Sequence, residues 1–189
     1  MSQYNVAIVG ATGLVGETLL SLLEDREFPV SSLIPIASER SQNKHVQFKG
    51  QNINIQVLND FNFAGVDFAF FSAGALVSEQ FAPTAAKAGA IVIDNTSQFR
   101  YQDHIPLVIP EVNPDALINF SSTNIIANPN CSTIQMLVAL QPIHQTAKIT
   151  KINVSTYQSI SGAGRKTLDI FNQQLISDEY PNSGDPMLF

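Results

Sequence analysis

The chain has 189 residues, 44% of them hydrophobic, so it can bury a core of ordinary size and is not expected to be disordered. Sixteen acidic and ten basic side chains give a formal net charge of −6, with no Lys/Arg run that would follow a phosphate backbone. We therefore expect no nucleic-acid partner. The first apolar run is too short to span a bilayer and follows no basic segment, so we expect a cytoplasmic protein with no membrane partner.

Apolar runs typical of strands alternate with helical patterns over the first 130 residues. A short β-rich run ends at Gly10, and leucines at helical spacing follow it until Pro29. A second helix is expected over 78–87, with Ser78 as its N-cap and Gly89 as its C-terminal stop. The other expected strands cover 32–38, 45–58 (two short strands), 67–73, 90–96, 106–113 and 123–129. This alternation predicts the α/β class, with a Rossmann-like, doubly wound and mostly parallel sheet.

The pattern changes after residue 130. We expect a helix over 132–145, a strand of more antiparallel character over 151–160 and a helix over 164–177. The last twelve residues contain the proline, glycine and asparagine of a loop. One strand and its helices do not complete a domain, so residues 1–130 are predicted to form a dinucleotide-binding domain and 131–189 the incomplete start of a second, α+β domain.

A glycine-rich turn, GATGLVG, joins the first expected strand to the first expected helix. Gly10, Gly13 and Gly16 would let the backbone turn tightly and let a pyrophosphate approach the N–H groups at the helix N-terminus. A triplet of glycines is a weak signal, but its place between a strand and a helix is the context that supports dinucleotide binding. The alternative is a tight turn that serves only the packing of helix on sheet.

The end of the second strand carries the residues that distinguish NADP from NAD. NAD-specific folds usually place an acidic residue there, whereas Ser38, Arg40 and Ser41 offer hydroxyls and a guanidinium that suit a 2′-phosphate. NADP is therefore the predicted cofactor. Glu39 argues mildly for NAD, and a solvated charged loop is the alternative.

The chain has a single cysteine, Cys131, which cannot form an internal disulfide and suits a reducing compartment. Most cysteines without a disulfide are small buried hydrophobes. Cys131, however, directly precedes an expected helix, whose N-terminal N–H groups would stabilise a thiolate and an oxyanion. Asn128 and Asn130 place neutral donors beside it. A catalytic nucleophile and ordinary packing both remain open.

Other polar side chains follow the ends of the later strands. Arg100 comes shortly after an apolar strand, where it could hold a phosphate or a carboxylate with two parallel hydrogen bonds. The histidines are not placed beside Cys131 by the sequence, and no cluster has the spacing of metal ligands. The remaining candidates are Glu111, Gln158, Gly162, Gly164, Arg165 and Lys166.

The motifs GATGLVG, SERS, DNTSQFR, PLVIPEVN, ANPNCST and YQSISGAGR occur in an order and spacing that resemble the aspartate-β-semialdehyde dehydrogenase family. The resemblance covers essentially the whole chain, and NPNCST followed by YQSISGAG is its most specific part. N-acetyl-glutamyl-phosphate reductase is similar in plan but usually carries a pattern such as PGCY around its cysteine. Asn130 and Ser132 argue against that family.

The resemblance implies NADP-dependent reductive dephosphorylation of L-aspartyl-4-phosphate to L-aspartate-4-semialdehyde, a step in lysine, threonine and methionine biosynthesis. It implies Cys131 as the nucleophile that forms a thioester. It also implies inorganic phosphate as a further ligand and a homodimer or homotetramer for the full-length enzyme. Further roles by resemblance are Gln158 for positioning; Arg100 and Asn130 for phosphate; and Gly10, Thr12, Gly13, Leu14, Val15, Ser38, Arg40, Ser41, Gly162 and Gly164 for the cofactor.

One departure from the family is large. Its members are about twice as long, and their acid–base histidine and most of their catalytic and dimerisation domain lie beyond the part matched here. A cysteine without its base lacks the usual activation partner, so we expect a truncated chain with little or no turnover that still binds the dinucleotide. A non-catalytic NADP-binding module or paralogue, and an enzyme like N-acetyl-glutamyl-phosphate reductase, are the alternatives.

Overall fold

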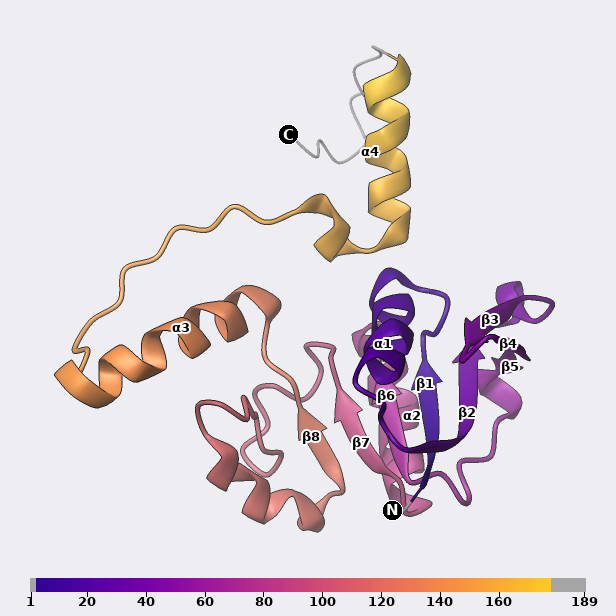
Figure 1. Cartoon of the computed structure of the whole chain (residues 1–189), viewed down its shortest axis with the longest axis horizontal. Helices are drawn as coiled ribbons and strands as arrows, with labels where there is room; N and C mark the ends of the chain where they lie inside the picture. The colour runs from indigo at the N-terminus through magenta and orange to yellow at the C-terminus, as the bar shows by residue number, and fades with distance from the viewer. Residues whose placement is uncertain (1–2, 178–189) are drawn as a thin grey trace. The chain divides into compact units, whose positions relative to one another are not determined.

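The computed structural model describes residues 3–177 and is dominated by one parallel sheet with helices on its two faces (Figure 1). The strands are β1 (Tyr4–Val9), β2 (Val30–Ala37), β3 (His45–Phe48), β4 (Gln51–Asn54), β5 (Gln56–Val57), β6 (Phe68–Phe71), β7 (Ile91–Asp94) and β8 (Ile125–Ala127). The α-helices are α1 (Leu14–Asp25), α2 (Ala75–Lys87), α3 (Cys131–Ala147) and α4 (Arg165–Ser177). Short 3-10 helices are η1 (Glu39–Ser41), η2 (Leu58–Asp60), η3 (Pro114–Ser122) and η4 (Ile160–Ala163).

Six strands form the main sheet in the order β5-β2-β1-β6-β7-β8, and every neighbouring pair is parallel. Strands β3 and β4 form a separate antiparallel hairpin. From β1 the chain first adds β2 and β5 on one side of β1. It then adds β6, β7 and β8 on the other side. The order therefore reverses beside β1, which is the place where doubly wound sheets bind ligands.

The two faces of β1 explain why helices cover both sides of the sheet. Val6 and Ile8 pack in one buried cluster with Leu20 and Leu23 of α1. Ala7 and Val9 point the other way and pack in a second cluster with the buried alanines of α2, Ala82, Ala85 and Ala86. Because side chains alternate along a strand, an entirely apolar strand must be covered twice. The predicted fold class is confirmed.

Helix α2 begins earlier than the sequence predicted. Its N-cap is Gly74, and Ser78 lies inside the helix, so the prediction of Ser78 as an N-cap was wrong. The side chain of Ser78 is fully buried and donates a hydrogen bond of 2.7 Å to the carboxylate of Asp94 instead. The predicted stop is confirmed, because Gly89 follows the C-cap Ala88 with φ of 103°.

Residues 106–113 do not form the predicted strand. They make one isolated bridge, between Leu107 and Ala127 of β8. The side chain of Asn113 occupies backbone groups that a longer ladder would need, since it accepts from the N–H of Ile109 (2.8 Å) and donates to the carbonyl of Leu107 (2.9 Å). The two prolines of this segment, Pro106 and Pro110, also lack backbone donors.

The chain divides into two compact units between Ile152 and Asn153, and each is described by itself. Residues 151–160 contain no strand, so that prediction was also wrong; a strand needs a partner for its hydrogen bonds, and no described residue pairs with this segment. Helix α4 confirms the last predicted helix. The predicted loop at residues 178–189 lies outside the described residues.

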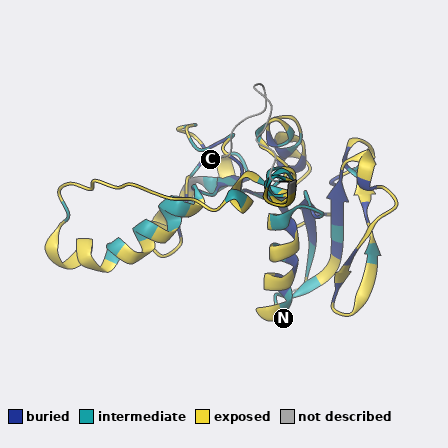
Figure 2. Ribbon diagram, turned by 90° about the horizontal axis from the view of Figure 1, so that it is seen from above, coloured by how far each residue is buried: buried dark blue, intermediate teal, exposed yellow. Residues whose placement is uncertain are grey.

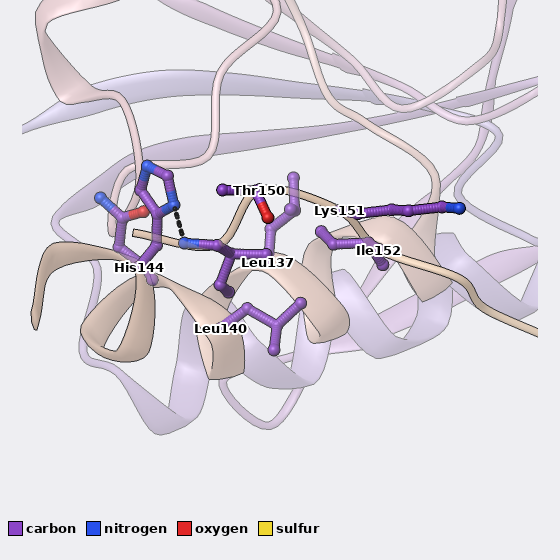
Figure 3. Close-up of a pocket in the computed structure, with 8 residues that line it drawn as sticks. Leu137, Leu140, His144, Thr150, Lys151 and Ile152 are labelled. Atoms are coloured by element: carbon purple, nitrogen blue, oxygen red, sulfur yellow. Dashed lines mark hydrogen bonds between the residues drawn. The ribbon is translucent and has the colours of Figure 1, made fainter. Parts of the chain in front are cut away.

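Helix α3 has no buried residue, as Figure 2 shows by its teal and yellow colouring. Near its C-terminus Leu137, Leu140 and His144 line a cavity of about 340 Å³ together with residues 149–152 (Figure 3). The Nδ1 atom of His144 accepts a hydrogen bond of 3.2 Å from the N–H of Ile149. This bond holds the segment that follows the helix against the last turn of α3. Over residues 3–177, no helix has the length and apolar character needed to cross a membrane.

Candidate functional site

The carboxyl ends of the parallel strands bring polar residues from distant parts of the sequence to one edge of the sheet. The strands β1, β2, β6, β7 and β8 all point toward this edge. The residues that directly follow them are Gly10, Ser38, Ser72, Asn95 and Asn128. Ligands of open α/β sheets bind outside this edge.

The glycine-rich turn closes against the sheet and leaves no room for side chains at two of its positions. Gly10 has φ of 95°, and a β-carbon there would come within 2.9 Å of the Ser72 hydroxyl. A β-carbon on Gly16 would lie 2.3 Å from the carbonyl oxygen of Gly10. The first turn of α1 therefore sits directly on the turn that precedes it. The N-cap Gly13 makes no side-chain cap hydrogen bond, and uncapped N–H groups at a helix N-terminus are a favourable place for an anion.

A cavity of about 590 Å³ opens beside this turn. The predicted cofactor residues Gly10, Thr12, Gly13, Ser38 and Arg40 all line it. Leu14, Val15 and Ser41 do not, and Ser41 is buried. The walls also include residues that the sequence analysis missed: Asn59, Ser72, Val77, Gln80 and Phe81. Ser72 could have been found, because it directly follows an apolar strand; the others carry no signal in the sequence.

Charged groups meet where the cavity reaches the end of β2. Glu39 and Arg40 are neighbours in η1, and both are exposed and line the cavity. The carboxylate of Glu39 accepts a hydrogen bond of 3.4 Å from the side-chain amide of Asn59 in η2. The guanidinium of Arg40 remains beside the cavity as a group that can bind an anion.

A second group of polar residues lies at the ends of β7 and β8. The Nε–H of Arg100 donates to the carbonyl of Asn128 (3.0 Å), and its Nη2–H donates to the carbonyl of Asn95 (3.1 Å). The side-chain amide of Asn128 donates to the side-chain oxygen of Asn95 at 2.5 Å. These bonds join the loop after β7 to the segment that leads to Cys131.

Cys131 is the first residue of α3 and its thiol is free and exposed. Asn130 is the N-cap, and its side-chain oxygen accepts a hydrogen bond of 3.0 Å from the N–H of Ser132. The cap fixes the start of the helix immediately beside the sulfur, while the amide –NH₂ of Asn130 stays available as a donor. Within residues 3–177 the thiol is therefore not part of either buried cluster.

The remaining predicted residues belong to the second unit. Gln158 is exposed in an extended segment, Gly162 lies in η4, and Gly164 ends η4 with φ of 93°. They form a turn that leads into α4. The structure describes this unit by itself, so the role of these residues stays a prediction.

The histidines lie in three separate places. His45 is in β3, His104 lines a different cavity beside Phe99 and Ile125, and His144 bonds to the N–H of Ile149. Within residues 3–177, no three His, Cys, Asp or Glu side chains are grouped so that they could hold a metal ion.

The sheet, the glycine turn and the cavity define a dinucleotide-binding domain of the doubly wound α/β class. Residues 5–120 match the family model described as "Semialdehyde dehydrogenase, NAD binding domain". The chain is 58% identical over 167 residues to aspartate-semialdehyde dehydrogenase 2 of Vibrio cholerae, covering 88% of this chain and 50% of that protein. It is 48% identical over 190 residues to the Bacillus subtilis aspartate-semialdehyde dehydrogenase, covering 96% and 54%.

Solved structures of aspartate-semialdehyde dehydrogenases are also similar to this chain. The Vibrio cholerae aspartate semialdehyde dehydrogenase II complexed with ASA superposes with a TM-score of 0.92 at 53% identity, covering 98% of this chain and 56% of that one. The Candida albicans aspartate semialdehyde dehydrogenase with NADP has a TM-score of 0.65 at 25% identity, covering 78% and 48%. The chain belongs to the aspartate-semialdehyde dehydrogenase family. It spans about half the length of the relatives it matches.

Proposed function

We propose that the cavity beside the glycine turn binds NADP. The pyrophosphate would lie against the N-terminal N–H groups of α1, where Gly10 and Gly16 allow the backbone to approach closely. Arg40, with Ser38 beside it, would hold the 2′-phosphate. Among the described residues that line the cavity, Glu39 carries the carboxylate that opposes this, and its hydrogen bond to Asn59 occupies one of its oxygens. Bound NADPH supplies hydride to an acyl group.

We propose that Cys131 is the nucleophile of a reductive dephosphorylation of L-aspartyl-4-phosphate to L-aspartate-4-semialdehyde. Its thiolate attacks the acyl carbon, the C–O bond to phosphate breaks, inorganic phosphate leaves, and a thioester remains on the sulfur. Hydride addition to that acyl carbon gives a thiohemiacetal, which collapses to the aldehyde and the free thiolate. The reaction is thereby divided into two easier steps. The N-terminal N–H groups of α3 would stabilise the oxyanion of each step.

Arg100 and Asn130 are the groups proposed to bind the leaving phosphate. The guanidinium uses its Nε–H and one Nη2–H on two backbone carbonyls, and its other N–H groups remain to bind an anion. Asn130 would contribute its amide –NH₂ beside the sulfur. Gln158 is proposed to position the substrate. We propose a homodimer or homotetramer for the complete protein, by similarity to the family.

The observation that carries this proposal is the exposed thiol at the capped start of α3, next to a segment that is hydrogen-bonded to Arg100. Alkylation by iodoacetamide tests it without requiring turnover, because Cys131 is the only thiol in the chain. We expect the folded chain to react and NADP to slow the reaction. A thiol that reacts only after unfolding, or at a rate that NADP leaves unchanged, would contradict the proposal; Cys131→Ser is the control for labelling elsewhere.

A dinucleotide-binding role without catalysis is the second candidate, and the positions of the histidines favour it. The hydrogen bond of His144 to the N–H of Ile149 ties it to the far end of α3, and His45 lies in the separate hairpin. We therefore expect the 189-residue chain by itself to bind NADP with little dehydrogenase turnover. NADP-dependent oxidation of aspartate semialdehyde in the presence of phosphate, followed at 340 nm, measures this; substantial turnover by the purified chain would exclude the binding-only role.

A further inference from the structure

The carboxylate of Asp94 is completely buried at the end of β7 and takes no part in the chemistry proposed above. Its Oδ1 accepts hydrogen bonds from the hydroxyl of Ser78 (2.7 Å) and from the N–H of Thr96 (3.3 Å). Its Oδ2 accepts from the hydroxyl of Thr96 (2.8 Å). Ser78 lies in α2, so the carboxylate joins that helix to the loop that leaves β7.

This arrangement continues along the loop to Arg100. The hydroxyl of Thr96, besides donating to Asp94, accepts a hydrogen bond of 3.2 Å from the N–H of Gln98. The next residue, Phe99, is buried and belongs to the core cluster that contains Ala7 and Val9. Arg100 then returns to the start of the loop, because its Nη2–H donates to the carbonyl of Asn95. Residues 95–100 therefore form a closed loop that is fixed at both ends.

A buried carboxylate is costly unless its oxygens receive hydrogen bonds, and here three donors converge on two oxygens. An amide at this position would direct its –NH₂ group at a hydroxyl or an N–H and would leave the loop with fewer bonds. Ordering a long arginine side chain also costs conformational entropy, which a preorganised loop reduces. The hydrogen bonds of Thr96 to Asp94 and of the Gln98 N–H to Thr96 thus hold the backbone that leads to Arg100.

We propose that Asp94 is a positioning residue for Arg100, acting through Thr96 and the closed loop of residues 95–100. The inference rests on the proposed function in so far as Arg100 is the group that receives the phosphate. The side chain of Asp94 itself is completely buried. Its contribution is to hold the guanidinium of Arg100 on the carbonyls of Asn95 and Asn128.

Exchange of the Arg100 Nε–H with solvent, followed by ¹H–¹⁵N NMR of the 189-residue chain, measures this directly. The signal is assigned by its loss in Arg100→Lys. We expect at least about fivefold faster exchange in Asp94→Asn and in Thr96→Val, since both weaken the bonds that hold the loop. Thr96→Ser retains the hydroxyl and should keep the wild-type rate. Val92→Ala, a buried apolar change in the same strand, controls for loss of stability alone.

The results separate positioning from general destabilisation. Thermal unfolding identifies the variants that remain folded at the temperature of the exchange measurement, and Thr96→Val keeps the shape of the side chain if Asp94→Asn does not fold. Exchange at the wild-type rate in folded Thr96→Val, or an equal acceleration in Val92→Ala, would overturn the proposal. Titration with inorganic phosphate is a separate measurement: a wild-type Arg100 signal that does not respond would contradict the phosphate role and leave the positioning result standing.

Discussion

The Nε–H of Arg100 donates a hydrogen bond of 3.0 Å to the main-chain carbonyl of Asn128, and this bond joins the loop after β7 to the segment after β8. Asn128 is followed by Pro129, Asn130 and then Cys131, the first residue of α3. The guanidinium that follows β7 and the thiol that follows β8 thus lie beyond the ends of neighbouring strands.

Arg100→Lys should weaken the binding of phosphate beside Cys131. Lysine keeps the positive charge but has no planar fork, so it cannot hold two backbone carbonyls and still present donors to an anion. We expect the phosphate concentration that half-protects Cys131 from iodoacetamide to rise by about tenfold. Arg26→Lys is the matched control. Arg26 is the C-cap of α1, and this variant should behave as wild type. Equal protection in both variants would exclude Arg100 from the anion site.

Arg40→Gln should discriminate between the two nicotinamide dinucleotides. A charge-assisted hydrogen bond to the 2′-phosphate contributes about 1.5–3 kcal/mol, so the affinity for NADP should fall by roughly one to two orders of magnitude. The affinity for NAD, which lacks that phosphate, should change little. Isothermal titration calorimetry with each dinucleotide measures both, with Arg26→Gln as control. A parallel loss for NAD and NADP would place Arg40 elsewhere on the cofactor or show that the fold is damaged.

Gly16→Ala should destabilise the domain, because its β-carbon would lie 2.3 Å from the carbonyl oxygen of Gly10 and 2.8 Å from the Cα of Ala11. The backbone must move, and we expect the free energy of unfolding to fall by about 2–3 kcal/mol. Urea unfolding measures the change. Gly162→Ala, where nothing lies within 4 Å of the added carbon, should be nearly neutral. Equal free energies of unfolding for the two variants would show that α1 does not pack on the glycine turn as closely as described.

Asn130→Ala should remove the cap of α3. The side-chain oxygen of Asn130 accepts from the N–H of Ser132, and loss of such a cap costs about 1 kcal/mol. Asn130→Ser restores an acceptor at the same position and should recover most of the loss. Amide exchange of Ser132 and Thr133 reports on the first turn of the helix. If alanine and serine give the same exchange rates, the cap does not hold the turn that carries Cys131.

The order of strands and helices could be predicted because each is a local pattern. Apolar runs predicted β1, β2, β6, β7 and β8, and the glycine turn marked the junction of β1 with α1. The failures at 106–113 and at Ser78 share a cause, which is a side-chain hydrogen bond that the local pattern does not show. The segment 106–113 has the composition of a strand, but the side chain of Asn113 takes its backbone groups. Serine is a residue type typical of N-caps, but the hydroxyl of Ser78 donates to Asp94, which lies 16 residues further along the chain.

The sequence by itself determined the doubly wound class, the glycine turn and a cysteine at the start of a helix, because hydrophobic period, glycine spacing and capping act within a few residues. Only the tertiary structure decided that Asn59 reaches Glu39 across the cavity and that Arg100 lies on Asn128, 28 residues later in the chain. Such pairs depend on which strand ends become neighbours in the sheet. That order is set by the packing of whole helices on both faces, and no local pattern records it.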